Sequence, residues 1–483
     1  MCLGLIVVIF MAMASVSQTL ATDMTAVEKN GINDVIKSTM RPSGFKCKTM
    51  DLNLKKVAEG TSAAKPATLL TDLPIITSEN DVLAPSITTD GSGSILVMAE
   101  ASSSIFESDL AIKYSSDSGN SWLPGDGFMT FSIEGLEQSP CVDYTGSSEF
   151  QAYGSCMPDP LTNVLYIIHF PSMTDPEASW RDDDGWTVYQ VDLSGNYEDF
   201  KGIDVCGYPY GSNAPAPDFH GTIAWTSTDV GTGLETFCIL WEEEGTSLSL
   251  IYMEDVEGEV YDIAADIDLS TGIYYEAIEW KDAPGIIDDG IFVDFNRMEP
   301  GDPEWWMDEW GEVVFEGGAN PDIVADGGNC YLVYESIDPL YGSKDISCAY
   351  SHDNGETFRT TTITQTPIEN EYFPSVTAIG KTVICTYTRN GNLYTSISED
   401  GGITWEESEE IINDEDGSVV EEYRSADIAG QYVAWVDNRG DSLDIYFDLV
   451  GISAPVLVIE SVSGGFGVKA TVANIGTADA ENV

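Results

Sequence analysis

Residues 85–122 read PSITTDGSGSILVMAEASSSIFESDLAIKYSSDSGNSW, and residues 321–358 read PDIVADGGNCYLVYESIDPLYGSKDISCAYSHDNGETF. The two segments align without a gap. A third segment, 374–405, repeats the layout with a shorter middle loop, and 426–450 keeps its central hairpin. Each copy alternates short runs rich in Val, Ile, Tyr and Thr with Gly, Asn, Asp and Ser, which is typical of antiparallel strands joined by turns. The sequence therefore predicts an all-β repeat protein.

The spacing of the copies predicts the architecture. Asp353 and Asp400, which occupy the same place in two successive copies, are 47 residues apart, about the length of a four-stranded blade. Between residues 141 and 320 the copies are degenerate, but the rhythm of strands and turns continues. We expect a β-propeller of four-stranded blades over residues 71–450, with seven blades favoured and six to eight allowed by the length.

Three turns share the pattern Ser-x-Asp-x-Gly-x-Ser/Thr-aromatic. Their main residues are Ser115, Asp117, Gly119 and Trp122; Ser351, Asp353, Gly355 and Phe358; and Ser398, Asp400, Gly402 and Trp405. This pattern resembles the Asp-box, or BNR repeat, of sialidases and related propellers. In that family the box is a structural turn that lies away from the catalytic face, so the resemblance implies a sialidase-like fold and assigns these aspartates a structural role.

Charge and the chain start constrain the partners and the location. With 82 acidic and 20 basic residues the net charge is -62, which excludes nucleic acid as a partner because phosphate binding needs clustered Lys and Arg. The apolar run 3–16 and the small residues after it predict a signal peptide over 1–21, followed by an N-terminal segment or linker over 22–70. We expect a secreted or cell-surface protein, attached to a membrane only through a missing C-terminal anchor or a retained N-terminal segment.

The cysteine count agrees with export, since eight cysteines remain beyond the predicted signal peptide. Closeness in sequence suggests the disulfides Cys330–Cys348, Cys141–Cys156 and Cys206–Cys238, with Cys47 and Cys385 left as a fourth pair. The alternative is that several of these residues are buried free thiols.

Residues 454–483 change in character and alternate apolar and polar positions around a Gly-rich turn. They resemble the first strands of an immunoglobulin-like module of microbial surface proteins. About 30 residues cannot form a sandwich of about 100. We therefore expect either a truncated Ig-like module or strands that dock on the propeller.

No catalytic motif stands out. A sialidase-like site would need three arginines that clamp a carboxylate, a Tyr activated by a Glu, and an acidic Asp. The early Phe/Tyr-Arg-Ile-Pro motif of sialidases is not in the sequence. A triad would have to come from four arginines that no motif selects: Arg181, Arg297, Arg389 and Arg424.

Other candidate sites come from local composition. Trp305, Trp306 and Trp310 could form a sugar-stacking platform, or they could pack an inserted loop onto its own blade. The three histidines are far apart and predict no metal site. The acidic turns 182–185 and 414–417 do not fit an EF-hand, so we predict no definite cofactor and leave calcium open.

The sequence favours a non-catalytic propeller that binds an extracellular glycan or protein through the loops of one face. The alternative is a sialidase-like glycoside hydrolase. An arginine cluster with a Tyr–Glu pair at the mouth of the central channel would favour the enzyme, and a flat or aromatic face would favour the binding module.

Overall fold

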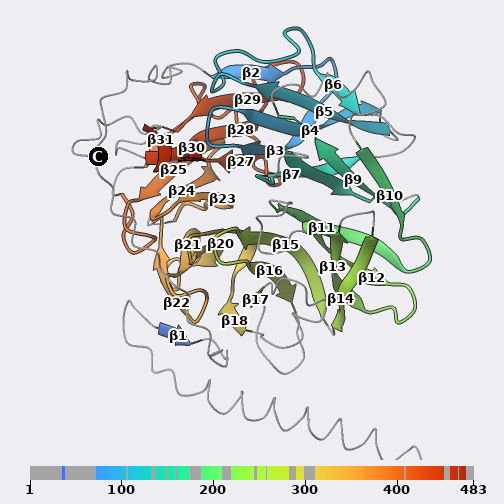
Figure 1. Cartoon of the computed structure of the whole chain (residues 1–483). Helices are drawn as coiled ribbons and strands as arrows, with labels where there is room; N and C mark the ends of the chain where they lie inside the picture. Colours follow the sequence, from blue (N-terminus) through green and yellow to red (C-terminus); the bar gives the residue numbers. More distant parts are fainter. Residues whose placement is uncertain are drawn as a thin grey trace, which may run out of the picture.

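The computed structural model describes residues 35–37 and 72–474, except 105–106, 132–136, 147–150, 159–161, 171, 174–186, 209–218, 244–246, 257, 282–289, 298–310, 365, 367, 407–408, 451–456 and 466. The described residues form strands and turns without helices (Figure 1). None of them belongs to a helix that could cross a membrane.

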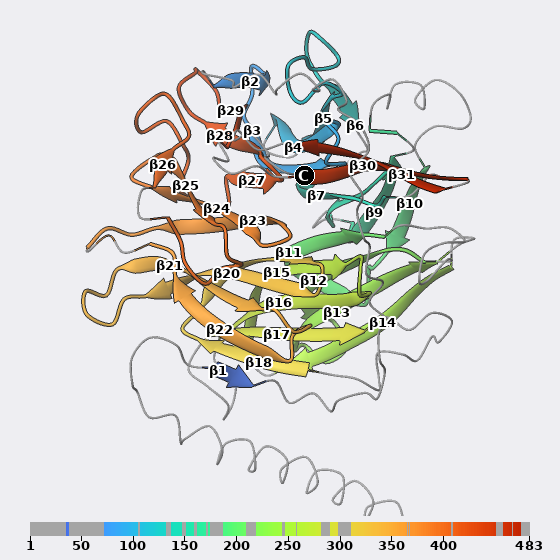
Figure 2. The same cartoon turned by 60° about the vertical axis from the view of Figure 1, so that its left-hand side comes forward.

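Seven four-stranded antiparallel sheets surround a central axis (Figures 1 and 2). Blade 1 contains β3 (Val82–Thr89), β4 (Ile95–Ser104), β5 (Glu107–Ser115) and β6 (Met129–Phe131). Blade 2 contains β7 (Gln138–Tyr144), β8 (Ala152–Met157), β9 (Val164–Phe170) and β10 (Thr187–Asp192). Blade 3 contains β11 (Tyr197–Gly207), β12 (Phe219–Asp229), β13 (Glu235–Glu243) and β14 (Ser247–Val256). Blade 4 contains β15 (Glu259–Asp268), β16 (Ile273–Lys281), β17 (Gly290–Arg297) and β18 (Gly311–Glu316).

The remaining blades complete the ring. Blade 5 contains β19 (Ala319–Asp326), β20 (Asn329–Ile337), β21 (Lys344–Ser351) and β22 (Thr357–Thr362), and β1 (Val35–Lys37) adds a fifth strand beside β22. Blade 6 contains β23 (Tyr372–Ile379), β24 (Thr382–Arg389), β25 (Asn392–Ser398) and β26 (Glu410–Ile411). Blade 7 contains β27 (Ala426–Ala429), β28 (Tyr432–Asp437) and β29 (Asp444–Leu449). The predicted all-β propeller and the favoured count of seven blades are confirmed.

The ring closes through the start of the propeller. β2 (Leu73–Ile76) pairs with β29 and supplies the outer strand of blade 7, so one sheet holds both ends of the repeat region. Arg439 reinforces this closure. Its guanidinium donates to Asp437 at 2.8 and 2.6 Å and also contacts Asp72, which directly precedes β2. Because these two carboxylates are almost fully buried, their contacts with Arg439 hold the closing strand in place.

The hydrophobic core lies between the blades rather than in one central mass. Ile323, Cys330 and Phe358 of blade 5, for example, pack against Ile291 and Phe315 of blade 4. Because each blade has a neighbour on both sides, both faces of its sheet are covered, which explains why the second strands are almost continuously buried. Beyond the blades, β30 (Leu457–Gly465) and β31 (Gly467–Asn474) pair as a hairpin. Its Ig-like nature remains a prediction.

Candidate functional site

Polar side chains on the innermost strands join every pair of neighbouring blades. At each junction an oxygen of the earlier strand accepts a hydrogen bond from a backbone N–H of the next innermost strand. The acceptors and donors are Ser86 and Val142 (3.1 Å), Asp143 and Gly207 (2.8 Å), Asp204 and Ala265 (2.8 Å), Asp266 and Ala325 (2.7 Å), Asp322 and Val376 (2.7 Å), Thr377 and Gly430 (3.0 Å), and Asp427 and Ile87 (2.9 Å). We call this set the inter-blade clamps.

The innermost strands begin with a repeated strained step. Ala84, Ser139, Asn320 and Phe373 each precede a proline and have φ between 45° and 50°. Residues other than Gly rarely adopt this conformation, so neighbouring groups must hold it in place. Glu279 accepts the Asn320 N–H at 2.8 Å, and Glu335 accepts the Phe373 N–H at 3.0 Å, each from the blade before. The starts of the innermost strands are therefore fixed rigidly.

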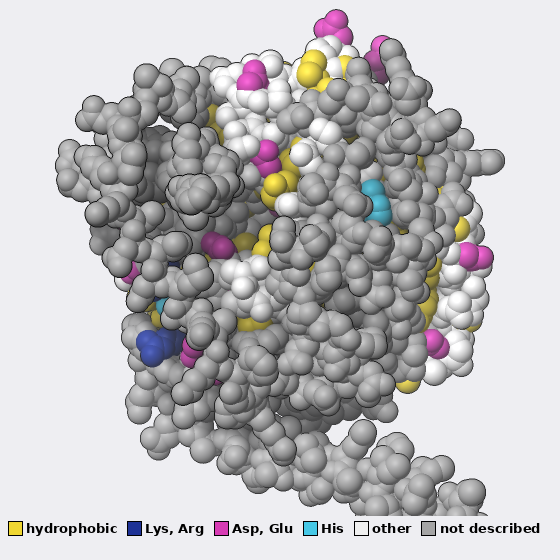
Figure 3. Space-filling model, viewed as in Figure 1, with side chains coloured by type: hydrophobic (Ala, Val, Ile, Leu, Met, Phe, Trp, Pro, Cys, Tyr) yellow, Lys and Arg dark blue, Asp and Glu magenta, His cyan; other side chains and the backbone are white. Residues whose placement is uncertain are grey.

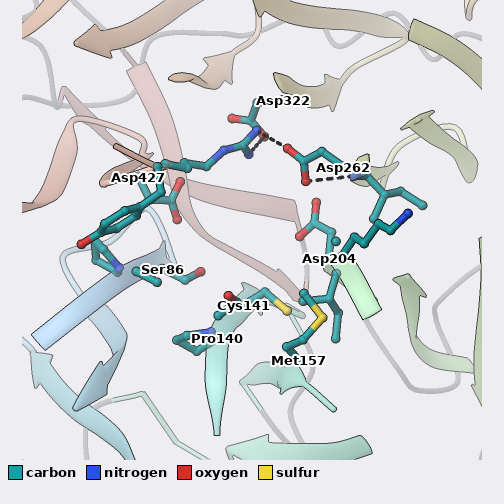
Figure 4. Close-up of a pocket in the computed structure, with 17 residues that line it drawn as sticks. Ser86, Pro140, Cys141, Met157, Asp204, Asp262, Asp322 and Asp427 are labelled. Atoms are coloured by element: carbon teal, nitrogen blue, oxygen red, sulfur yellow. Dashed lines mark hydrogen bonds and ion pairs between the residues drawn. The ribbon is translucent and has the colours of Figure 1, made fainter. Parts of the chain in front are cut away.

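A cavity of about 230 Å³ lies among these strand starts. Asp204, Asp262, Asp322 and Asp427 enter it from blades 3, 4, 5 and 7. Figure 4 shows these aspartates around the upper part of the pocket, with Pro140, Cys141 and Met157 on the opposite wall. We call this cavity the axial pocket.

Arg424 spans the axial pocket from the segment before β27. Its Nη2 lies 3.2 Å from Asp262 Oδ2, and its Nη1 lies 3.6 Å from Asp322 Oδ1. Nη2 also donates to the Pro321 carbonyl at 2.5 Å. The side chains of Arg424 and Asp262 are each 31% exposed, so this ion pair forms part of the accessible wall.

The electrostatics of the pocket are dominated by unbalanced carboxylates. Burial raises the pKa of Asp322 to about 6 against the opposing effect of Arg424, and burial also raises the pKa of Asp204, Asp262 and Asp427. Because every one of these carboxylates also accepts a backbone N–H, their first role is structural. Their remaining lone pairs can accept hydrogen bonds from a ligand.

The three Ser-x-Asp turns adopt one common geometry. In each, the Ser hydroxyl donates to the Asp and accepts the Gly N–H, and the Asp accepts the N–H and the hydroxyl of the following Ser or Thr, at 2.6–3.0 Å. The turns join the third and fourth strands of blades 1, 5 and 6. Antiparallel pairing places them at the end of the blades away from the axial pocket.

The aromatic residue of each turn packs against the preceding blade. Trp122 meets Phe447 edge to face at 4.8 Å, Phe358 meets Phe315 at 6.0 Å, and Trp405 donates to the Thr361 hydroxyl at 3.2 Å. These contacts support a structural role for the turns.

The predicted disulfides are wrong, because Cys141, Cys156, Cys206, Cys238, Cys330, Cys348 and Cys385 are all buried free thiols. In the pairs Cys330–Cys348, Cys141–Cys156 and Cys206–Cys238, both members lie in one sheet but on opposite faces, and Cys47 of the fourth pair lies outside the described residues. Cys330, for instance, packs between blades 4 and 5, and Cys348 packs between blades 5 and 6. The register pairs Cys330 with Ser351 and Cys348 with Val333, so closeness in sequence does not bring the sulfur atoms together.

Other sequence-based candidates are separated or lie outside the described residues. Trp305, Trp306 and Trp310 fall in the undescribed segment 298–310. Cys47 and the acidic turn 182–185 also lie outside the described residues. Within the described part of the chain, no group of three or more His, Cys, Asp or Glu side chains could hold a metal ion. Calcium remains an untested expectation.

The sequence analysis missed the pocket aspartates. The signal was a Ser or Asp followed by Ile or Val at the start of the repeats, as in Ser86, Asp322, Ser375 and Asp427. The innermost strands of blades 2 to 4 lie where the copies are degenerate in sequence, so this pattern could not identify their residues.

The sequence matches no protein-family model and no curated protein. Similar solved structures include a protein of unknown function from Dyadobacter fermentans, with 13% identity over 79% of this chain and 98% of that chain (TM-score 0.42). An α-L-arabinofuranosidase of Fusarium graminearum has 12% identity over 79% and 98% of the two chains (TM-score 0.40). A Trypanosoma rangeli sialidase has 12% identity over 79% and 57% (TM-score 0.36).

The chain is thus a seven-bladed β-propeller whose structural neighbours include sialidases and glycoside hydrolases. These likenesses concern the fold alone. The activity has to be argued from the residues of this chain.

Proposed function

We propose that this protein is a secreted or cell-surface propeller that binds an extracellular glycan or protein without chemical turnover. Its three Ser-x-Asp turns would be structural Asp-boxes, and the ligand would insert one small polar group into the axial pocket. The observation that carries the proposal is the pocket itself, a concave polar site among the starts of the innermost strands with an apolar wall.

The arrangement of arginines argues against a sialic acid substrate. Among the described residues, Arg424 is the arginine that lines the pocket. Arg389 is occupied by Glu371 and Glu409, and Arg439 by Asp437 and Asp72. A ligand carboxylate would therefore meet one guanidinium surrounded by aspartates, where a sialidase needs an arginine triad.

Surface charge also argues against an anionic ligand. Acidic side chains are spread over the described part of the face shown in Figure 3, whereas basic ones gather at one edge. With a net charge of -62, long-range forces repel anionic ligands and favour neutral or cationic ones.

A glycoside hydrolase is the second candidate, and the raised pKa of Asp322 favours it. A carboxyl group with a pKa of about 6 beside other carboxylates has the property required of a general acid. Hydrolysis would need a second carboxylate placed across the glycosidic bond. In the binding module, the same aspartate would only accept hydrogen bonds.

One screen separates the two candidates. The full chain is incubated with neutral, amino and sialylated glycans and with extracellular proteins, and both retention and released sugars are measured. The binding module predicts retention without release, weakened by Asp262→Asn and kept in the exposed-residue control Asp441→Asn. Sugar release that Asp322→Asn abolishes would overturn the proposal in favour of the hydrolase, and neither retention nor release would contradict both.

A further inference from the structure

Exposed apolar side chains concentrate on one part of the molecule. Among the described residues, the four most exposed large hydrophobic side chains are Leu340 (83%), Ile368 (79%), Tyr341 (58%) and Ile337 (55%). All four belong to two segments of blade 5, the hairpin from the end of β20 to β21 and the connection from β22 to β23. We call these four residues the blade 5 patch. Exposed apolar residues that are scattered singly need no explanation, whereas a group indicates a contact surface.

The two segments are hydrogen-bonded side by side. Asn370 Oδ1 accepts the Lys344 N–H at 2.9 Å, and the Glu371 N–H donates to the Lys344 carbonyl at 2.9 Å. Lys344 in turn lies opposite Ile337 in the register of β20 and β21. Ile368, two residues before Asn370, is therefore held beside the hairpin that carries the other three residues of the patch.

The hairpin loop presents its apolar side chains on an ordered backbone. Asp338 Oδ1 accepts the N–H groups of Leu340 at 2.6 Å and of Tyr341 at 2.9 Å. The Asp338 carbonyl accepts the Gly342 N–H at 2.9 Å, and the Asp338 N–H donates to the Ser343 carbonyl at 2.8 Å. A loop that is already ordered loses less conformational entropy when a partner binds.

Ile368 provides an observation that is independent of exposure. Its φ is 69°, which a β-branched residue rarely adopts because the side chain is crowded there. The base of the connection is fixed by the Thr366 hydroxyl, which donates to Glu371 and accepts a hydrogen bond from Arg389 Nη1 at 3.1 Å. Strained residues of this kind gather at ligand-binding sites, where the fold has to present a side chain.

The blade 5 patch is separate from the axial pocket. The innermost strand β19 begins at the pocket, and antiparallel order places both segments at that same end of blade 5. None of the four patch residues lines the pocket. The patch is therefore a second surface on the same face of the propeller.

Carboxyl groups surround the patch. Glu369 follows Ile368 in the chain and is exposed, and Asp338 lies in the hairpin loop. Burial, together with the charges of Glu371 and Asp338, raises the pKa of Asp345 to about 6, which places these three groups near one another. The rim of the patch is therefore acidic.

The cations beside the patch are already paired. Lys344 Nζ lies 2.6 Å from Oε2 of the buried Glu335. Arg389 is shared by three glutamates, Glu369 among them, at 2.6–3.4 Å. Among the described residues Asp338 forms no ion pair. Negative charge thus remains at the rim for a cationic partner.

Charge decides between the possible occupants. A second copy of this chain also carries a net charge of -62, so long-range repulsion opposes self-association through an acidic patch. An anionic membrane surface is repelled for the same reason. A glycan stacks on aromatic rings, and three of the four patch residues are aliphatic. A protein segment with apolar and basic side chains complements both the patch and its rim.

We propose that the blade 5 patch docks a basic segment of a partner protein, in which apolar side chains are flanked by Lys or Arg. The apolar side chains lie against Leu340, Tyr341 and Ile368, and the cations lie over Asp338 and Glu369. This inference goes beyond the proposed function, because it concerns a surface that shares no residue with the axial pocket.

Binding of synthetic peptides to the full chain tests the partner class. Three short labelled peptides serve as probes: one alternates Leu with Lys, one alternates Leu with Glu, and one alternates Ser with Lys. We expect the Leu–Lys peptide to bind at least about tenfold more tightly than either of the others, as measured by fluorescence anisotropy at physiological ionic strength. Equal binding of the Leu–Glu peptide would overturn the cationic partner, and equal binding of the Ser–Lys peptide would overturn the apolar contact.

Variants locate the docking surface. The double variant Leu340→Ser/Tyr341→Ser should weaken Leu–Lys binding about tenfold or more, since aromatic and apolar anchors dominate such contacts. The control Leu269→Ser alters an exposed leucine in the β15–β16 turn, on the opposite face, and should leave binding unchanged. Unchanged binding in the folded double variant would refute the patch.

Ile368→Gly separates recognition from folding. Glycine adopts a positive φ without strain, so this variant should unfold at the same or a higher temperature while it binds the Leu–Lys peptide more weakly. Unchanged peptide binding in this variant would remove Ile368 from the surface and refute the reasoning from its backbone.

The remaining occupants and the axial pocket are distinguished in the same experiments. Phosphatidylcholine vesicles that bind the chain, or a dimer in sedimentation, either of them lost in the double variant, would overturn the proposal in favour of a lipid surface or a second copy. Asp262→Asn, which alters the axial pocket, should leave Leu–Lys binding unchanged. Loss of peptide binding in Asp262→Asn would contradict a separate surface, whereas its retention beside an inactive pocket would contradict only the proposed function.

Discussion

Acidification from pH 7 to pH 5 should stabilise this protein. Burial raises the pKa of Asp143 and of Asp322 to about 6, from 3.8 in an unfolded chain. Between these values the folded state binds protons that the unfolded state has released. The free energy of unfolding therefore rises as the pH falls through 6, and this contribution is complete only below 3.8.

The magnitude follows from the two pKa values. For one group, linkage gives about 1.4 kcal/mol between pH 7 and pH 5, and about 3 kcal/mol over the full range. A domain of this size gains roughly 1 °C in Tm per kcal/mol. Asp143 and Asp322 together should therefore raise Tm by about 3 °C at pH 5.

General repulsion among the acidic residues acts in the same direction and must be separated from the local effect. Melting curves are therefore recorded by circular dichroism in 1 M NaCl, where the Debye length is about 3 Å and exposed charges are screened. Asp143 serves best as the probe because its oxygens accept the N–H groups of Tyr144 and Gly207 in a buried clamp. Asp143→Asn should reduce the gain by the contribution of this one group, about 1 °C, and Asp441→Asn should not reduce it. A Tm that falls from pH 7 to pH 5, or an unchanged gain in Asp143→Asn, would refute this reasoning.

Three further predictions concern the framework. Ser351→Ala removes three hydrogen bonds from its turn and should cost about 1–3 kcal/mol in chemical denaturation, whereas replacing the exposed Glu356 by Ala should cost little. Arg439→Met leaves the carboxylates of Asp437 and Asp72 unpaired and should cost about 3 kcal/mol, measured in the same way; an unchanged midpoint would exclude Arg439 from the closure. Reducing agent should leave Tm unchanged, and iodoacetamide should label the cysteines of the blades only after unfolding, because the thiols are buried and free.

The blade pattern was predictable because it is local. A turn such as Ser398 to Trp405 fixes its own geometry through hydrogen bonds between residues four apart, so its sequence is sufficient to identify it. Strand length and turn spacing then limit the number of blades. Between the third and fourth strands of blades 2 to 4 the sequence lacks the Ser-x-Asp-x-Gly pattern, and those blades were located only from the spacing of their strands.

The disulfide error has a physical origin in the same sheets. Side chains alternate between the two faces of a strand, so two cysteines on neighbouring strands meet only when register and facing both agree. Cys206 is opposite Thr222, and Cys238 is opposite Trp225, which places their sulfur atoms in different inter-blade cores. Nearness in sequence does not show which face of the sheet each cysteine occupies.

The pocket was beyond sequence reasoning because its residues have two roles. Asp204, Asp322 and Asp427 lie in the sequence where a propeller needs acceptors for the next blade, and only the closed ring brings these carboxylates together with Arg424. A clamp aspartate can therefore be replaced by Asn, which keeps one acceptor, but replacement by Ala would loosen two blades as well as the pocket. Loss of binding in an Ala variant therefore says nothing about the ligand. An Asp→Asn variant removes the charge and keeps the shape of the side chain, so it tests ligand recognition separately from the packing of the blades.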